Sequence, residues 1–340
     1  MGQRANFEEY YSGESLQGSY LAGVYYPDKT RVGWWKNGYP EYFAKVLNSV
    51  SWNQIHVTID GELIDLNKME PAHFKRVLDM ENGVLLRSYR IKTSKGVEVD
   101  FEWKRFVSMT RKNIGVIELS LRASQNCEVN IHSTLSGDVH NQDSNYDEYF
   151  WENTVAGVEG SRLWVSQKTK KTKFSVNSSS LHNIQLGTNN YTSNSYKNEK
   201  DCGVRFAFGL KKDEKAIIEK YVAVCSSMYL PESVLSSNSA KEASEAHAAG
   251  FTTLQQEQSN AWAEIWRNCD VEIEGDDEAQ QSIRFNIFQL FQTYTGDDSR
   301  LNIGPKGFTG EKYGGSTYWD TEAYCLPFYL ATAPSDVARN

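Results

Sequence analysis

The sequence predicts two unlike regions, a long N-terminal region of antiparallel β-strands followed by a shorter region of helices. Between residues 16 and 228, short apolar runs alternate with polar residues and are broken by turn residues. After Pro231, alanine-rich and amphipathic stretches at helical spacing replace this pattern. Short strands with few helical patterns between them are typical of an antiparallel β-sandwich. The predicted units are a β-sandwich domain over residues 1–230, a helical linker over 231–270 and the start of a helical domain over 271–340.

Alternation of apolar and polar residues is the evidence for the strands. Gln54–Ile59 (QIHVTI) alternates and is followed by Asp60-Gly61, a strong signal for a two-residue hairpin turn. Glu98–Trp103 alternates acidic and apolar residues, which predicts one wet and one buried face. The other predicted strands are 85–93, 97–107, 114–122, 127–135, 163–167, 203–210 and 215–224.

Three features of the β region call for interpretation, and two of them have an alternative. The lysine run Lys168–Lys173 predicts a solvated edge strand protected by its charges, with an anion site as the alternative. The polar tract Asn177–Lys200 predicts long surface hairpins. Trp34-Trp35 and Trp151 could line a sugar cleft, but aromatic side chains of this kind are more often part of a core or an interface.

The helical region begins with a predicted capping box, Ser239–Glu242, and a helix that continues to about Ala249. Beyond Gly250, a second helix from Thr253 places Ala261, Trp262, Ile265 and Trp266 on one side. Two acids, Asp276-Asp277, then favour the start of an amphipathic helix over about 276–295. We expect a last helix to begin near Asp320 and to kink or end at Pro327.

Composition and motifs exclude several classes of function. With 39% hydrophobic and 24% charged residues the chain is typical of soluble globular proteins, and a net charge of −8 argues against a nucleic-acid partner. The sequence has no apolar run of membrane-spanning length, and its polar, acidic first residues lack the apolar stretch expected of a signal peptide. Its five cysteines form no C-x-x-C pair, which predicts reduced thiols in a cytoplasmic protein. The six histidines lack metal-ligand spacing, and no nucleotide-binding glycine motif is present, so we expect no metal site and no cofactor.

The stretch Gly304–Leu330 (GPKGFTGEKYGGSTYWDTEAYCLPFYL) holds the candidate binding residues. A glycine-rich loop leads to Trp319 and Asp320, and an aromatic plate beside a carboxylate suits a sugar, whose C–H face stacks while its hydroxyls donate hydrogen bonds. The alternative is that Asp320 is a plain N-cap and Trp319 a core residue. Asp320 and Glu322 are not expected to form a glycosidase pair, because side chains two positions apart on a helix diverge.

The order GPKGFTGEKYGG followed by YWDTEA resembles the segment that opens the catalytic barrel of the glycoside hydrolase family 65 disaccharide phosphorylases. The maltose branch is the most similar, since other branches more often carry His and Phe at the positions of Ser316 and Tyr318. Further segments that resemble the family are Arg4–Glu9 and Gly18–Tyr25, and those that resemble the maltose branch are Gly33–Pro40 and Asn141–Tyr146.

The resemblance implies a β-sandwich, a helical linker and the first helices of an (α/α)6 barrel, so we expect a truncated barrel and a fragment that is inactive alone. It implies inverting phosphorolysis of maltose to β-D-glucose 1-phosphate and glucose, with inorganic phosphate as co-substrate and a homodimeric full-length enzyme. The catalytic Glu would lie beyond Asn340. Trp319 and Asp320 would hold the transferred glucose, and Lys306, Phe308 and Tyr313 are further candidates for the same subsite.

Other functions remain open on the sequence. Within the family, a kojibiose, nigerose or trehalose phosphorylase, or a related hydrolase, would share the same motifs. From a different class, the chain could be a non-catalytic carbohydrate-binding or assembly module whose sandwich is its whole function.

Overall fold

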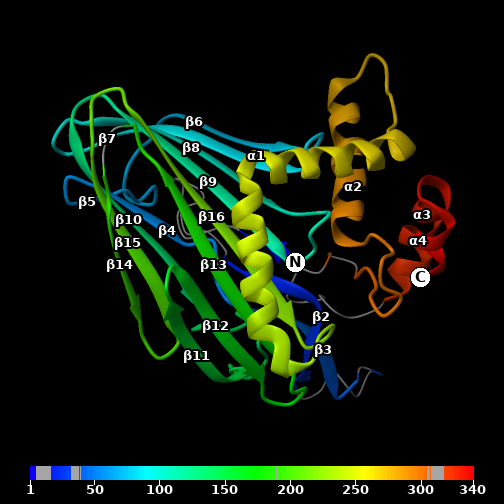
Figure 1. Cartoon of the computed structure of the whole chain (residues 1–340). Helices are drawn as coiled ribbons and strands as arrows, with labels where there is room; N and C mark the ends of the chain where they lie inside the picture. Colours follow the sequence, from blue (N-terminus) through cyan, green and yellow to red (C-terminus); the bar gives the residue numbers. More distant parts are fainter. Residues whose placement is uncertain (5–16, 32–37, 39, 188–189, 305–306, 308–317) are drawn as a thin grey trace.

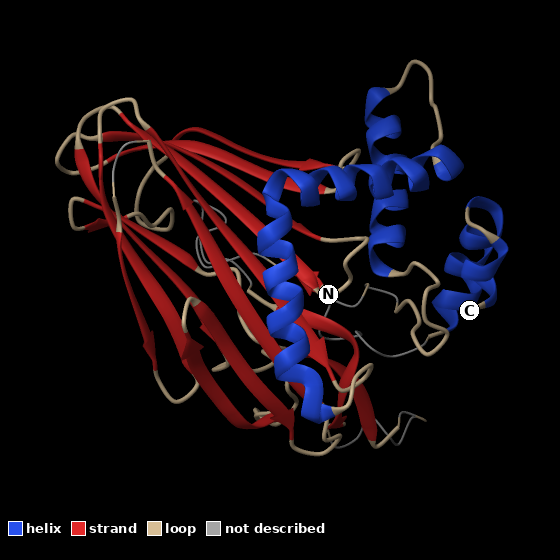
Figure 2. Cartoon of the chain, viewed as in Figure 1, coloured by secondary structure: helices blue, strands red, loops and turns tan. Residues whose placement is uncertain are grey.

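The computed structural model describes residues 1–4, 17–31, 38, 40–187, 190–304, 307 and 318–340. A large β-sandwich occupies one side of the molecule and the helices the other, with the first long helix lying across the sandwich (Figures 1 and 2). This arrangement confirms the predicted antiparallel sandwich followed by a helical part. Within the described residues, no helix is long and apolar enough to cross a membrane.

Three antiparallel sheets form the β region in the described part of the chain. The five-stranded and eight-stranded sheets face each other around one apolar core that includes Val57, Phe101, Leu119 and Ile131. The small sheet contains, in order, β1 (Gly2–Gln3), β2 (Ser19–Lys29) and β3 (Tyr42–Asn48). The five-stranded sheet contains β14 (Thr192–Lys197), β15 (Asp201–Leu210), β10 (Cys127–Ser136), β4 (Ile55–Ile59) and β5 (Glu62–Leu63). The eight-stranded sheet contains β11 (Trp151–Glu159), β12 (Arg162–Thr169), β13 (Ser175–Gln185), β16 (Lys215–Ser226), β9 (Ile114–Ala123), β8 (Glu98–Val107), β7 (Val84–Lys92) and β6 (Ala72–Asp79).

The predicted strands are confirmed wherever alternation was clear. Asp60 and Gly61 both have positive φ, 49° and 87°, as a two-residue hairpin turn between β4 and β5 requires. In β8, Val99, Phe101 and Trp103 are buried while their neighbours are partly or fully exposed. Trp151 is buried as well, and its indole Nε1 donates to the Asn48 carbonyl at 2.7 Å, which supports the core reading for this residue.

The predictions for the two polar stretches, Asn177–Lys200 and Lys168–Lys173, are partly wrong. The first half of Asn177–Lys200 is not a surface hairpin, because β13 lies between β12 and β16 and its serines are buried. The helix above it supplies a polar partner for two residues of this strand, since the Ser239 hydroxyl donates to Asn177 Oδ1 at 2.5 Å and lies 2.9 Å from Ser179 Oγ. The second half does form the exposed edge strand β14. The lysine run is not an edge strand either, because β11 covers β12, and Lys171 and Lys173 lie in the following turn, where they pair with glutamates.

Helix α1 (Leu235–Cys269) follows the 3-10 turn η2 (Glu232–Val234) and bends sharply at Gly250, whose φ and ψ are 78° and 161°. Its first half packs on β13 and β16, and its second half continues toward the other helices (Figure 1). The predicted break at Gly250 is confirmed. The predicted capping box is wrong, because the helix starts four residues before Ser239. The Ser239 hydroxyl donates instead to Asn177 on β13.

The second half of α1 is fixed to the hairpin ends of the eight-stranded sheet. Gln258 accepts from the Met109 amide at 2.8 Å and donates to the Gly83 carbonyl at 3.1 Å. Glu257 forms a bidentate ion pair with Arg111, and the Trp266 indole donates to the Met80 carbonyl at 2.9 Å. These contacts attach the helical region to the sandwich.

The remaining helices form a smaller apolar cluster. Helix α2 (Asp277–Thr293) begins as predicted, with Asp276 as N-cap accepting from the Ala279 amide at 2.9 Å. The chain then reaches a π-helical turn, η3 (Thr321–Cys325), which continues directly into α3 (Leu326–Thr332) and is followed by α4 (Ser335–Arg339). Pro327 therefore does not end the helix, and the irregularity falls on the turn before it.

Lys220 on β16 is a fully buried cation inside the sandwich. Its ammonium donates to the Thr134 carbonyl at 2.7 Å, and burial lowers its pKa from 10.5 to about 7. The titratable groups around it are His182 on β13, His56 on β4, His132 on β10 and Cys202 on β15. None of these is a carboxylate that would stabilise the charged lysine.

We expect Lys220→Met to stabilise the protein by about 1–4 kcal/mol at pH 6, because the mutation removes a buried charge. The folded-state pKa lies below the unfolded value, so the unfolded chain binds more protons between pH 7 and 10.5 and wild-type stability rises with pH there. The advantage of the variant should therefore shrink from pH 7 to 10. Urea titrations at several pH values test this, with the half-exposed Lys215→Met on the same strand as control. A variant less stable than wild type at pH 6 would show that the Lys220 hydrogen bonds outweigh its desolvation.

Candidate functional site

The predicted sugar-holding residues lie where the chain re-enters a helix after α2. Trp319 and Asp320 have helical geometry directly ahead of η3. The Trp319 side chain is 82% exposed, and Asp320 is exposed with no capping hydrogen bond to the helix. In this structure Trp319 is therefore not part of a core, and the Asp320 side chain makes no capping hydrogen bond. The other candidates, Lys306, Phe308 and Tyr313, lie outside the described residues.

The π-helical turn gives this segment its shape. The Leu326 amide donates to the Thr321 carbonyl, five residues back, where an α-helix would use the fourth. Pro327 follows immediately and has no amide hydrogen to donate to Ala323, so a regular α-helical turn at this point would lose a bond and meet the proline ring. A wider turn relieves this conflict, and π turns of this kind are frequent at functional sites.

The inner side of η3 and α3 is tightly anchored. Tyr329 is buried, and its hydroxyl donates to the Leu290 carbonyl of α2 at 2.8 Å. Its ring packs edge-on against Phe291, whose ring also meets Phe328. This cluster supports Trp319 and Asp320 on a fixed base.

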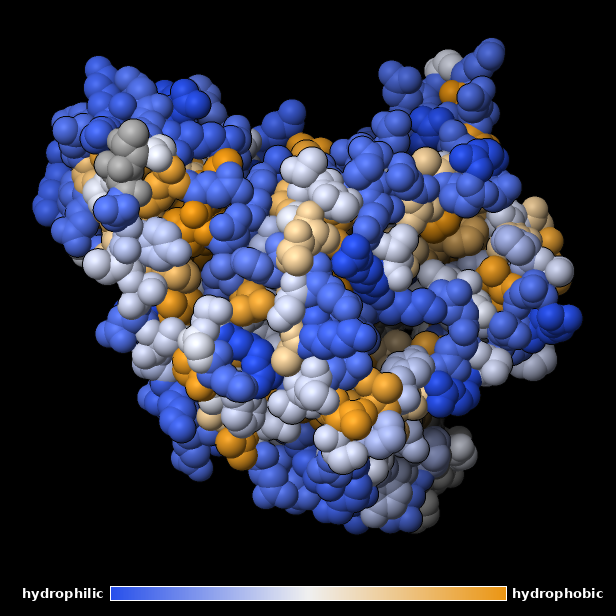
Figure 3. Space-filling view, viewed as in Figure 1, coloured by the Kyte–Doolittle hydropathy of each residue, from blue (hydrophilic) through white to orange (hydrophobic). Residues whose placement is uncertain are grey.

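The outer side of the same segment is open. Tyr324 and Leu330 are 76% and 68% exposed, and apolar surface is visible among hydrophilic residues on the side of the molecule formed by these helices (Figure 3). Burial, and secondly the charge of Asp320, raise the pKa of the Cys325 thiol, so the carboxylate of Asp320 acts electrostatically on the base of the turn. An exposed indole next to an exposed carboxylate can stack on a sugar ring and accept from its hydroxyls.

A cleft of about 1570 Å³ lies between the end of the sandwich and the helices, and the sequence did not predict it. Its described lining does not include Trp319 or Asp320. Two ion pairs, Lys112–Asp297 at 3.0 Å and Arg300–Asp298, lie on its wall, and the hydrogen bonds from Arg300 hold the pKa of Asp298 well below its usual range. The residues that line the cleft come from both the β-sandwich and the helical region, so no local sequence pattern predicts it. No group of three or more His, Cys, Asp or Glu in the described residues is placed to hold a metal ion.

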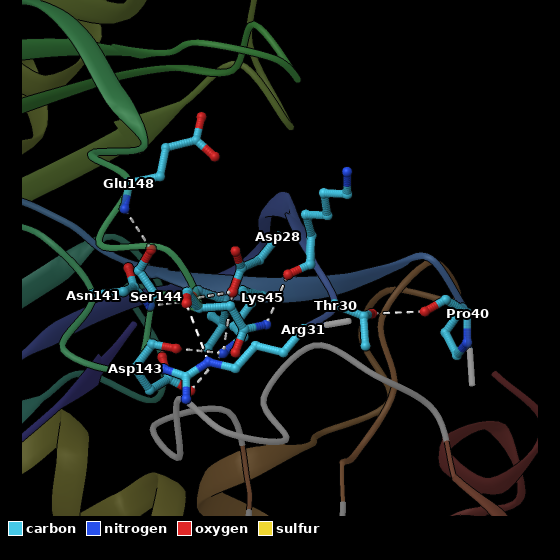
Figure 4. Close-up of polar contacts among 12 residues, drawn as sticks. Asp28, Thr30, Arg31, Pro40, Lys45, Asn141, Asp143, Ser144 and Glu148 are labelled. Carbon is cyan, nitrogen blue, oxygen red and sulfur yellow. Dashed lines mark hydrogen bonds and ion pairs between the residues drawn. The ribbon is translucent and has the colours of Figure 1, made fainter. Parts of the chain in front are cut away.

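One of the two segments singled out for the maltose branch, Asn141–Tyr146, contacts the base of the β2–β3 hairpin (Figure 4). Of Gly33–Pro40, only Gly38 and Pro40 are described, so the contacts seen are those at the base of the hairpin. Asn145 donates its backbone amide to Asp28 Oδ2 at 3.0 Å and its side-chain amide to the Lys29 carbonyl at 3.0 Å, while its own carbonyl accepts from Arg31 Nε at 3.2 Å.

A buried ion-pair network lies under these contacts. The Lys45 ammonium is 2.7 Å from Asp143 Oδ2 and 3.4 Å from Asp28 Oδ2, and the exposed fractions of the Lys45 and Asp28 side chains are only 7% and 1%. Beside it, the Tyr26 hydroxyl donates to Glu148 at 2.5 Å. We define Asn141–Glu148 as the brace loop, because it fixes the hairpin to the sandwich.

The fold is a sandwich attached through a bent linker to a helical region, and comparison with known proteins shows that it belongs to a class of carbohydrate-active proteins. The model of the glycosyl hydrolase family 65 N-terminal domain matches residues 1–265, and that of the family 65 central catalytic domain matches residues 284–340. The chain belongs to glycoside hydrolase family 65.

Three proteins that this chain resembles are named as phosphorylases. The chain is 42% identical to the maltose phosphorylase of Bacillus subtilis, over 100% of this chain and 45% of the relative. It is 30% identical to the alpha,alpha-trehalose phosphorylase of Thermoanaerobacter brockii, over 98% of this chain and 44% of the relative. The solved structure of a putative kojibiose phosphorylase from the human microbiome superposes with a TM-score of 0.86 at 26% identity, over 97% of this chain and 43% of that one. The chain thus spans less than half the length of these proteins.

Proposed function

We propose that this protein acts in the inverting phosphorolysis of maltose to β-D-glucose 1-phosphate and glucose, as a cytoplasmic homodimeric enzyme that needs no cofactor. A phosphate oxygen attacks the anomeric carbon from the face opposite the glycosidic bond. That bond breaks, its electron pair stays on the leaving oxygen, and a general acid protonates this oxygen. Phosphate is already anionic at neutral pH, so it needs no base to activate it, whereas the water of an inverting hydrolase does.

Within this reaction, Trp319 and Asp320 hold the transferred glucosyl unit. The indole provides a stacking wall and the carboxylate accepts hydrogen bonds from two hydroxyls. The observation that carries this assignment is the open presentation of both side chains on a fixed helical base. No catalytic acid is assigned within residues 1–340.

We propose maltose as the substrate because the chain is more similar in sequence to the maltose phosphorylase than to the trehalose, kojibiose and nigerose phosphorylases. The test uses a protein in which residues 1–340 are continued by a complete family 65 catalytic domain (the complete enzyme). Maltose, kojibiose, nigerose and trehalose are each incubated with and without phosphate. We expect phosphate-dependent cleavage, with the highest kcat/KM for maltose, and no glucose 1-phosphate from residues 1–340 alone. A higher kcat/KM for another disaccharide would contradict the substrate assignment.

A further inference from the structure

Thr321, the residue after the tryptophan–aspartate pair, connects two distant points of the chain. Its hydroxyl donates to the carbonyl of Ile303 at 2.6 Å. Ile303 is buried in the helical cluster just before Gly304, where the glycine-rich stretch begins. One side-chain bond therefore ties the chain entering this stretch to the helix that follows it.

The same residue also forms the π-helical turn. The Thr321 carbonyl accepts from the Leu326 amide, and the Thr321 amide donates to the Tyr318 carbonyl at 3.1 Å. Thr321 is thus held by its amide, its carbonyl and its hydroxyl, while the two residues before it are exposed. Of these three contacts, only the hydroxyl bond depends on the identity of the side chain.

The partner of that hydroxyl is itself fixed. Ile303 is only 5% exposed and belongs to the apolar cluster formed by α2 and Tyr329. A hydrogen bond to such a carbonyl fixes the start of η3 relative to α2. Without it, the start of η3 would lose a side-chain link to the buried cluster, and Trp319 and Asp320 would shift with it.

We propose that Thr321 is a positioning residue, whose hydroxyl bond to Ile303 fixes Trp319 and Asp320 in the geometry that holds the transferred sugar. The inference rests on the proposed function, because it assigns a role toward the same sugar. The side chain acts through its neighbours and needs no contact with the substrate. A small displacement of residues that orient a substrate lowers the rate of the chemical step more than it weakens binding.

The test compares Thr321→Val with Thr321→Ser in the complete enzyme, using maltose and phosphate. Valine keeps the shape but removes the donor, so we expect kcat to fall about tenfold or more while KM changes less. Serine keeps the donor and should restore kcat to within about threefold of wild type. Thr332→Val is the matched control, because the Thr332 hydroxyl makes a similar bond to Phe328 along α3, away from Ile303.

The outcomes separate the inference from the proposed function. If the wild type is active and Thr321→Val keeps the wild-type kcat, the inference is wrong and the proposed function stands. The same holds if the kcat of Thr321→Ser is no higher than that of Thr321→Val. An equal loss of kcat in Thr332→Val would show a merely structural effect and overturn the inference as well. A wild type without phosphate-dependent cleavage overturns both. If the valine variant does not fold, Thr321→Ala removes the donor without a branched side chain and carries the same expectations.

Discussion

Replacing Asp320 with alanine in the complete enzyme is expected to reduce kcat/KM for maltose phosphorolysis by about 100- to 10,000-fold. The carboxylate is proposed to accept hydrogen bonds from two hydroxyls of the transferred glucose. Hydrogen bonds to a charged group contribute about 1.5–3 kcal/mol each, and two of them account for a loss of this size. Initial rates of glucose 1-phosphate formation at several maltose concentrations provide the measurement.

The fold should survive this change. Asp320 is exposed and makes no capping bond, so only its favourable interaction with the helix N-terminus is lost, at about 0.3–1 kcal/mol. Glu322→Ala is the matched control, because it removes another exposed carboxylate from the same turn and should keep most of the activity. Near-normal kcat/KM in Asp320→Ala would contradict the assignment of this residue.

Lys45→Met is expected to destabilise the protein by about 3–5 kcal/mol. The substitution leaves Asp28 and Asp143 close together with no cation between them, and Asp28 is almost fully buried. Breaking a buried ion pair by removing one partner costs far more than losing a surface pair, because the remaining charges stay desolvated. Urea titration compares the free energies of unfolding.

Lys68→Met is the control for this prediction. Lys68 also pairs with an aspartate, Asp65, at 3.2 Å, but its own side chain is 77% exposed. A change of at most about 1 kcal/mol is expected there. If Lys45→Met cost no more than the control, the network at the brace loop would not be what fixes the hairpin to the sandwich.

Local patterns predicted the strands well and failed where a distant element supplied the polar partner. Gln54–Ile59 and its Asp-Gly turn carry their whole signal in eight residues. Asn177 and Ser179 are as polar as a surface hairpin, but Ser239 of α1, some 60 residues later, covers them and bonds to both. Ser239 was misread for the same reason, because its hydroxyl serves β13 instead of starting the helix.

The sequence predicts which residues form the candidate site but not how the backbone places them. The order of Trp319 and Asp320 after the glycine-rich stretch indicated sugar binding, and the structure shows both exposed. The π-helical turn could not be foreseen, since Pro327 is compatible with a kink, an end or a wider turn. The link between Thr321 and Ile303 joins residues 18 apart and has no sequence signature.

The most direct test of the proposed function follows the first minutes of maltose cleavage by the complete enzyme with proton NMR, with and without phosphate. The account predicts β-D-glucose 1-phosphate and glucose in equal amounts, and no cleavage when phosphate is left out. Glucose released at the same rate without phosphate, or glucose 1-phosphate appearing first as the α-anomer, would contradict it.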